Sequence, residues 1–198
     1  MPVTTLFPTQ DNYVNYHLPN DVMPSPSTWK RLEIGVDLYD TGTGYHGLCY
    51  SFIQFDLSSI PAGATINSAN LFLRAHFVRG DYAPVFVDVY QTTTATWDEQ
   101  GITWNGMPQW DQQVLGSAEM DGSAGPQDVL ISILTSAISS PLTANVLSIV
   151  LAARDNPQSG LDIPSATFMD IGDVDAYSPW LQINYTEAST FSPKVMIF

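Results

Sequence analysis

The sequence predicts an all-β fold: an antiparallel β-sandwich of the jelly-roll type with one short helix. Apolar and polar residues alternate with a period of two in several segments, as they do in half-buried strands. Turn sequences such as IPAGAT, RGDYAP and DNPQSG separate these segments. The chain has 198 residues, of which 44% are hydrophobic and 13% charged, so it can bury the core of one globular domain.

Alternation identifies the strands in chain order. In the segment ANLFLRAHFV, for example, Leu71 and Leu73 would face inward, whereas Asn70 and Arg74 would face outward. The segments with clear alternation are 31–38, 69–78, 85–91 and 180–185. Weaker alternation predicts further strands at 3–7, 13–16, 50–55 and 146–153.

One segment has the spacing of a helix. Residues 128–140, DVLISILTSAISS, place apolar side chains three and four residues apart. Asp128 could cap the first turn of this helix and Pro141 would end it. We therefore expect the helix to span residues 128–140.

The order of motifs resembles the DNRLRE (disaggregatase-related) domain family, which is similar to jelly-roll carbohydrate-binding modules. The residues that carry the resemblance are, in the first part, Phe55, Asp56, Leu57, Ile60, Pro61, Gly63, Ala64, Ile66, Ala69, Leu71 and Leu73, in the second part Trp97, Glu99, Gly101, Thr103, Trp104, Asn105 and Pro108, and in the last part Pro179, Leu181, Ile183 and Tyr185. The resemblance implies one sandwich domain over residues 1–186, followed by a tail over 187–198. Members of this family serve as accessory, surface and structural modules.

The stretch TWDEQGITWNGMPQW, residues 96–110, contains three of the five tryptophans. Trp97 and Trp104 belong to the family pattern, which favours a structural plug for the sandwich over a platform for stacking sugar rings. In such a plug their indole N–H groups would bond to backbone carbonyls of the turns. Trp110 lies beyond the pattern and is the freer candidate for exposure and sugar binding.

Several aromatic residues in predicted loops are further candidates for binding a glycan, because sugars stack on aromatic rings and bond to nearby polar groups. These candidates are Trp29, Tyr39, Tyr45, His46 and Tyr82. The alternative is that each of them anchors its loop, which is the more common role of such residues. Since the chain has only 6 Lys and Arg residues, a neutral glycan fits it better than an anionic polysaccharide.

The sequence DIGDVDAY suggests a structural Ca²⁺ site. It places Asp170, Asp173 and Asp175 around Gly172 in a predicted turn, and closely spaced carboxylates are what Ca²⁺ requires. The alternative is an acidic loop that is simply solvated.

Charge and motifs argue against several classes of function. The formal net charge of −14 makes nucleic acids and anionic membranes poor partners. The sequence contains no phosphate-binding loop and no G-x-S-x-G or H-E-x-x-H motif. We therefore expect a protein that is not an enzyme.

The two ends of the sequence suggest its setting. The opening MPVTTLFPTQ has no export signal, and the tail ends in an apolar segment. The tail residues expected to contact another subunit are Phe191, Val195, Met196, Ile197 and Phe198. We interpret the chain as a structural or surface subunit of an extracellular or virus-like (phage) particle, such as a decoration or adhesion component. The alternative is a secreted carbohydrate-binding module that recognises a neutral glycan.

Overall fold

The computed structural model of the protein describes residues 1–23, 31–36, 48–78, 84–94, 97–121, 126–139, 144–154, 166–169 and 178–188. Within these ranges the chain forms strands and one short helix, α1, of Thr135–Ser139. The strands are β1 Val3–Leu6, β2 Pro8–Asn15, β3 Arg31–Val36, β4 Leu48–Asp56, β5 Thr65–Val78, β6 Val85–Thr92, β7 Trp110–Met120, β8 Gln127–Ile133, β9 Val146–Ala153, β10 Ala166–Met169 and β11 Trp180–Thr186.

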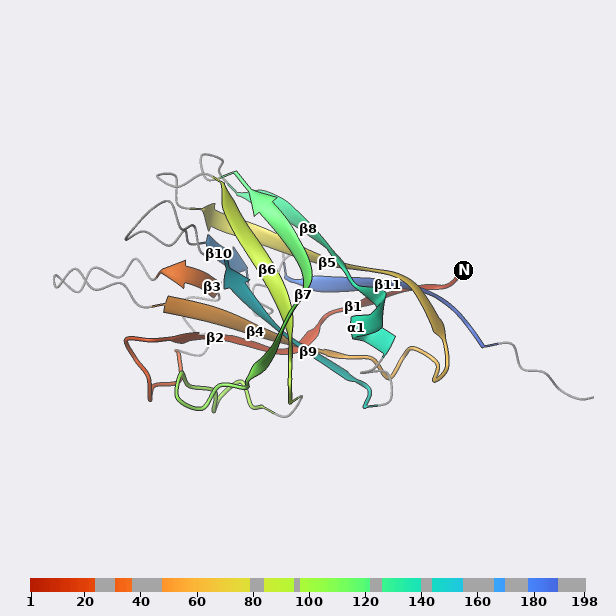
Figure 1. Ribbon diagram of the computed structural model, residues 1–198, viewed down its shortest axis with the longest axis horizontal. Coiled ribbons are helices and arrows are strands. Elements are labelled where there is room, and N and C mark those ends of the chain that lie inside the picture. Colours follow the sequence, from red (N-terminus) through yellow and green to blue (C-terminus); the bar gives the residue numbers. More distant parts are fainter. Residues whose placement is uncertain are drawn as a thin grey trace, which may run out of the picture.

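The strands form a sandwich of two antiparallel layers (Figure 1). In the first sheet the order is β8-β5-β11-β1. In the second sheet the order is β2-β4-β9-β6-β7. The predicted all-β sandwich with one short helix is confirmed.

Strand β3 joins the two sheets. Its residues 31–34 pair with β10, and β10 in turn pairs with β5 of the first sheet. Its residues Gly35 and Val36 pair with β4 of the second sheet. Gly35 has a φ of 83°. A residue with a side chain rarely adopts this left-handed conformation, so glycine allows the strand to turn from one sheet to the other.

The main core lies between the two sheets and follows the predicted alternation. Leu71 and Leu73 of β5 and Ile53 and Phe55 of β4 all belong to this core, and the four are between 0% and 3% exposed. Val87 in β6 and Ile183 in β11 belong to the same core. The period of two therefore identified the buried face of these strands correctly.

The helix predicted over residues 128–140 is wrong in its extent. Residues Gln127–Ile133 form strand β8, and α1 is a single turn that follows it. Val129, Ile131 and Ile133 are buried, whereas Leu130 is 53% exposed. With the apolar Leu130 among Val129, Ile131 and Ile133, the apolar residues of this segment also fit the spacing of a helix. The segment forms a strand instead, because its backbone pairs with β5.

Strands β7 and β10 were not predicted. Most side chains of β7 are exposed, because it is the edge strand of the second sheet, so its sequence has little apolar alternation. β10 has only four residues. Strand β2 also extends beyond the predicted 13–16, to Pro8–Asn15.

The sandwich closes along β7 and β8, where an edge of one sheet meets an edge of the other. The Leu134 N–H donates to the Leu115 carbonyl over 2.9 Å. At Gly116 a Cβ atom would lie 2.4 Å from the Ser132 carbonyl oxygen and 2.8 Å from Ile131 Cγ2. Glycine is therefore required here because the two strands approach so closely.

Candidate functional site

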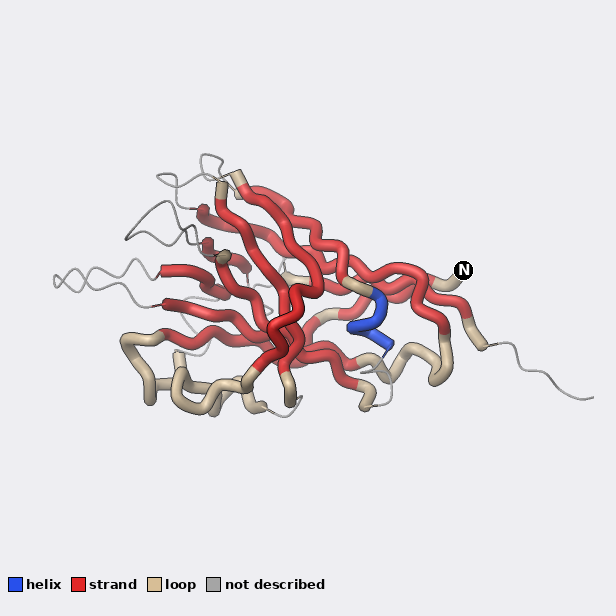
Figure 2. The backbone as a smooth tube through the Cα atoms, viewed as in Figure 1, coloured by secondary structure: helices blue, strands red, loops and turns tan. Residues whose placement is uncertain are grey.

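The outer face of the second sheet is covered by residues 97–109, which we call the Trp loop. The loop lies beside β2 on the lower side of the molecule (Figure 1) and appears there as a tan segment in Figure 2. It packs Ile102 against Val14, Phe52 and Val150, which are 0–2% exposed. This cluster is separate from the core between the sheets.

Aromatic rings surround this second cluster. The Trp104 ring stacks on Tyr50, with centroids 5.4 Å apart and planes at 14°. Trp110 meets Tyr50 edge-on at 5.0 Å, and Trp97 meets Phe52 edge-on at 6.1 Å. Packing against Tyr50 and Phe52 leaves the three tryptophans only partly exposed.

Polar bonds fix the Trp loop on the sheet. The Trp97 indole N–H donates to the Ser148 hydroxyl over 2.8 Å, in place of the backbone carbonyl expected from the sequence. From β2, the Asn12 amide donates to the Glu99 carbonyl over 2.8 Å, and the Gln10 side chain accepts from the Glu99 N–H over 2.9 Å. The structure thus places Trp97 and Trp104 on the outer face of the second sheet, not between the sheets.

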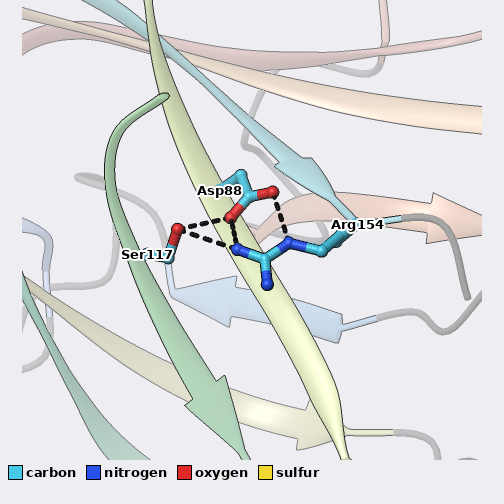
Figure 3. A network of polar contacts seen from close by, with 3 residues as sticks. All are labelled: Asp88, Ser117 and Arg154. Carbon is cyan, nitrogen blue, oxygen red and sulfur yellow. Dashed lines mark hydrogen bonds and ion pairs between the residues drawn. The ribbon is translucent and has the colours of Figure 1, made fainter. Parts of the chain in front are cut away.

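A charged network lies on another part of the same face (Figure 3). Arg154 donates from its Nε to Asp88 over 2.9 Å and from Nη2 to the second carboxylate oxygen over 2.5 Å. The Ser117 hydroxyl also donates to Asp88, over 2.5 Å. Burial would raise the pKa of Asp88, but the bonds from Arg154 and Ser117 and the charge of Arg154 outweigh it and lower the pKa. The network joins β6, β7 and the end of β9.

The outer face of the first sheet, which we call the open face, has a different character. Phe72 of β5 and Trp180 of β11 are cross-strand partners, and their rings stack with centroids 3.6 Å apart and planes at 5°. On the other side of Phe72 its partner in β8 is Leu130, which is 53% exposed. An apolar row therefore crosses three strands, and its members are partly or largely exposed.

Polar side chains form a second row beside the apolar one. Cross-strand pairing places Ser132, Asn70, Gln182 and Thr5 side by side over β8, β5, β11 and β1. The Ser132 hydroxyl donates to the Asn70 side-chain oxygen over 3.0 Å. On the other side of the apolar row, Arg74 of β5 pairs with Asp128 of β8, and their side chains lie 2.7 Å apart. Among the described positions of the open face, this is the only charged cross-strand pair. The charges of this pair cancel, so the described positions of the open face have almost no net charge.

Most residues predicted from the sequence as site residues lie outside the described ranges. This holds for the glycan candidates Trp29, Tyr39, Tyr45, His46 and Tyr82, for the calcium candidates Asp170, Asp173 and Asp175, and for the tail residues Phe191, Val195, Met196, Ile197 and Phe198. Trp110 is described and lies in the aromatic cluster at the start of β7. In the part of the chain that the structure describes, no three His, Cys, Asp or Glu side chains are grouped so that they could hold a metal ion.

The sequence reasoning missed Phe72 and Trp180. Both occupy the outward positions of strands whose inward positions were correctly identified, next to Leu71 and Leu181. The signal in the sequence was an aromatic residue at a position that the alternation of the strand directs outward, where a polar residue is expected. Their stacking depends on pairing between strands more than 100 residues apart, which alternation alone does not specify.

The fold is that of an all-β sandwich module. Residues 2–158 match the family model of carbohydrate-binding module family 96, and the chain belongs to this family. The match includes Phe72 and Leu130 but ends before Trp180. The expected similarity to carbohydrate-binding modules is thereby confirmed, whereas the DNRLRE family name is not tested by this match.

Other comparisons add little. The K1 cleaved adhesin domain of Lys-gingipain from Porphyromonas gingivalis W83 aligns over 94% of this chain and 100% of its own, with 8% identity and a TM-score of 0.32. A comparison with curated proteins gives no match. Among the described residues, there is no helix of the length and apolarity needed to cross a membrane.

Proposed function

We propose that the protein is a non-catalytic module that binds a neutral glycan on the open face of its first sheet. The observation that carries this proposal is the partly exposed Phe72–Trp180 pair with a polar row beside it. The two rings cover each other's inner faces, so a sugar ring would stack on an outer face of the pair, and the amides of Asn70 and Gln182 can bond to its hydroxyl groups.

One outer face of the sandwich is covered by a loop, whereas the open face has exposed apolar side chains. The Trp loop already occupies the outer face of the second sheet, and its rings Trp104 and Trp97 pack on Tyr50 and Phe52 of that sheet. On the open face, Leu130 and Val3 are more than half exposed. This packing favours a structural role for Trp97 and Trp104, so the proposed glycan site is placed on the open face.

Charge supports a neutral ligand. The described side chains of the two rows are uncharged, and the adjacent Arg74 is paired with Asp128. An anionic polysaccharide would find no unpaired cation among them, and the chain as a whole carries −14.

Affinity electrophoresis tests the proposal. The protein should be retarded in gels containing a neutral polysaccharide from a panel of barley β-glucan, xyloglucan and glucomannan, and alginate should not retard it. Trp180→Ala and Phe72→Ala should abolish the retardation. Ser68→Ala, on the same face but outside the two rows, is the control. Retardation by alginate that survives Trp180→Ala would contradict both the ligand class and the site.

A second candidate function is that of a surface or decoration subunit on a virion or another extracellular particle. It is supported by two exposed apolar residues at the margin of the first sheet: Val3, the first residue of β1, is 55% exposed, and Phe7, directly after β1, is 62% exposed. Exposed apolar groups at a sheet edge favour contact with another chain. The apolar sequence of the tail, KVMIF, would then supply further subunit contacts.

A further inference from the structure

The turn that follows β2 exposes apolar side chains at the margin of the Trp loop. Tyr16 is 57% exposed and Leu18 is 44% exposed. The Tyr16 ring lies edge-on to Trp104, with centroids 5.4 Å apart at 82°, and 6.0 Å from the ring of His17. The turn thus adds an accessible ring to an otherwise packed cluster.

Hydrogen bonds hold this turn in one conformation. Its backbone is bonded to β2, to the start of β4 and to the Trp loop. The bonds run from Tyr16 N to Leu48 O (3.0 Å), His17 N to Asn15 Oδ1 (2.8 Å), Leu18 N to Asn15 O (3.1 Å), Asp21 N to Leu18 O (3.1 Å) and Asn105 N to Pro19 O (3.0 Å). An exposed aromatic ring on a fixed backbone is prepared for binding, because little conformational entropy is then lost when a ligand binds.

Two side-chain amides, of Asn20 and Asn105, lie where the turn meets the Trp loop. The Asn105 amide nitrogen donates to the Asn20 side-chain oxygen over 2.8 Å, and both residues are exposed. Each side-chain amide has two N–H donors and an oxygen acceptor, so the pair keeps donors and an acceptor after this bond. The turn that exposes the Tyr16 ring also contains Asn20, and Asn105 follows Trp104, which the Tyr16 ring contacts. An exposed aromatic ring and an amide pair so connected are suited to a sugar ring and its hydroxyl groups.

We propose that Tyr16, Leu18, Asn20 and Asn105 form a second carbohydrate-binding site for a neutral sugar. The site rests on the proposed function, since it takes the same class of ligand. It is separate from the open face, because it adjoins the second sheet and the Trp loop. A protein with two such sites would bind a polysaccharide chain more tightly than a single short oligosaccharide, by avidity.

Titration calorimetry with cellohexaose, laminarihexaose and mannohexaose in turn tests the second site. The wild type should bind two molecules of at least one of these probes. Tyr16→Ala and Trp180→Ala should each leave one site, and the double variant should bind none. Tyr16→Phe keeps the ring and should keep both sites. On the polysaccharide itself, each single variant should lose at least about tenfold in affinity.

The outcomes separate the two proposals. Binding of one molecule that Tyr16→Ala leaves unchanged and Trp180→Ala abolishes would overturn the second site and support the open face. Binding abolished by Tyr16→Ala and unaffected by Trp180→Ala would overturn the open face instead. If none of the probes binds the wild type, both proposals fail. Since Tyr16 is exposed, unchanged melting temperatures should show that its variants are folded.

Discussion

At the scale of single residues, Trp97 shows how an indole can be fixed by packing and by one polar bond. It meets Phe52 edge-on and donates to Ser148, which is 3% exposed. Trp97→Phe should destabilise the protein by about 1 kcal/mol or more, because the Ser148 hydroxyl then loses its donor. Urea unfolding measures the effect. Ser148→Ala should cost a similar amount, and the double variant should cost less than the sum. Strictly additive effects would contradict this role of the bond.

Asp88 is a second residue with a measurable contribution, this time to pH dependence. Its folded-state pKa is lowered below 3.8, so the stabilisation it provides is present above the unfolded pKa and is lost as the pH falls through the folded pKa. The stability difference between the wild type and Asp88→Asn should therefore shrink as the pH falls below about 4.

Chemical denaturation at pH 7 and pH 3 measures this difference. The matched control is Asp128→Asn, which removes an exposed ion pair with Arg74 and should change stability little at either pH. A difference between wild type and Asp88→Asn that is equal at both pH values would show that the Arg154 pair contributes nothing specific to the ionised state.

At the scale of elements, the seam between β7 and β8 depends on one glycine. Gly116→Ala would bring a methyl group within 2.4 Å of the Ser132 carbonyl, so the strands must separate. We expect a loss of about 1–3 kcal/mol, as for other overpacked sites. Thermal or urea unfolding measures this loss of stability.

Gly101→Ala is the control, because its methyl group would lie 3.7 Å or more from the atoms of Asp98. This variant should change stability by less than about 0.5 kcal/mol. Equal stability of the two variants would mean that the seam is not tightly closed.

At the scale of the whole molecule, the tail tests the choice between an isolated module and a subunit of an assembly. Burying one large apolar side chain contributes about 1.5–3 kcal/mol, so the tail residues together could hold a subunit contact. Deleting residues 187–198 should leave the sandwich folded, since β11 ends at Thr186, and should abolish any assembly. Light scattering after size-exclusion chromatography measures the mass, and circular dichroism the fold.

Two results of the tail deletion would contradict the particle-subunit hypothesis. If the deletion variant unfolds, the tail belongs to the domain itself. If the wild type and the variant have the same oligomeric state, the tail holds no subunit contact, and the isolated binding module is the better description.

The sequence by itself determined the all-β class and the inward face of most strands. Alternation at Leu71, Leu73, Val87 and Ile183 requires one face of each strand to be buried, and this requirement is local. The sequence also indicated the aromatic stretch Trp97–Pro108 as a candidate plug, although its place on the outer face of the second sheet was not predicted.

Only the tertiary structure decided which outer face is covered and which is open. Residues 127–133 have apolar spacing compatible with a helix or a strand, and an edge of β5 decided for a strand. The same long-range pairing brought Trp180 onto Phe72, and the approach of β7 to β8 required Gly116. Such contacts join residues far apart in the chain, so a local pattern of side chains cannot specify them.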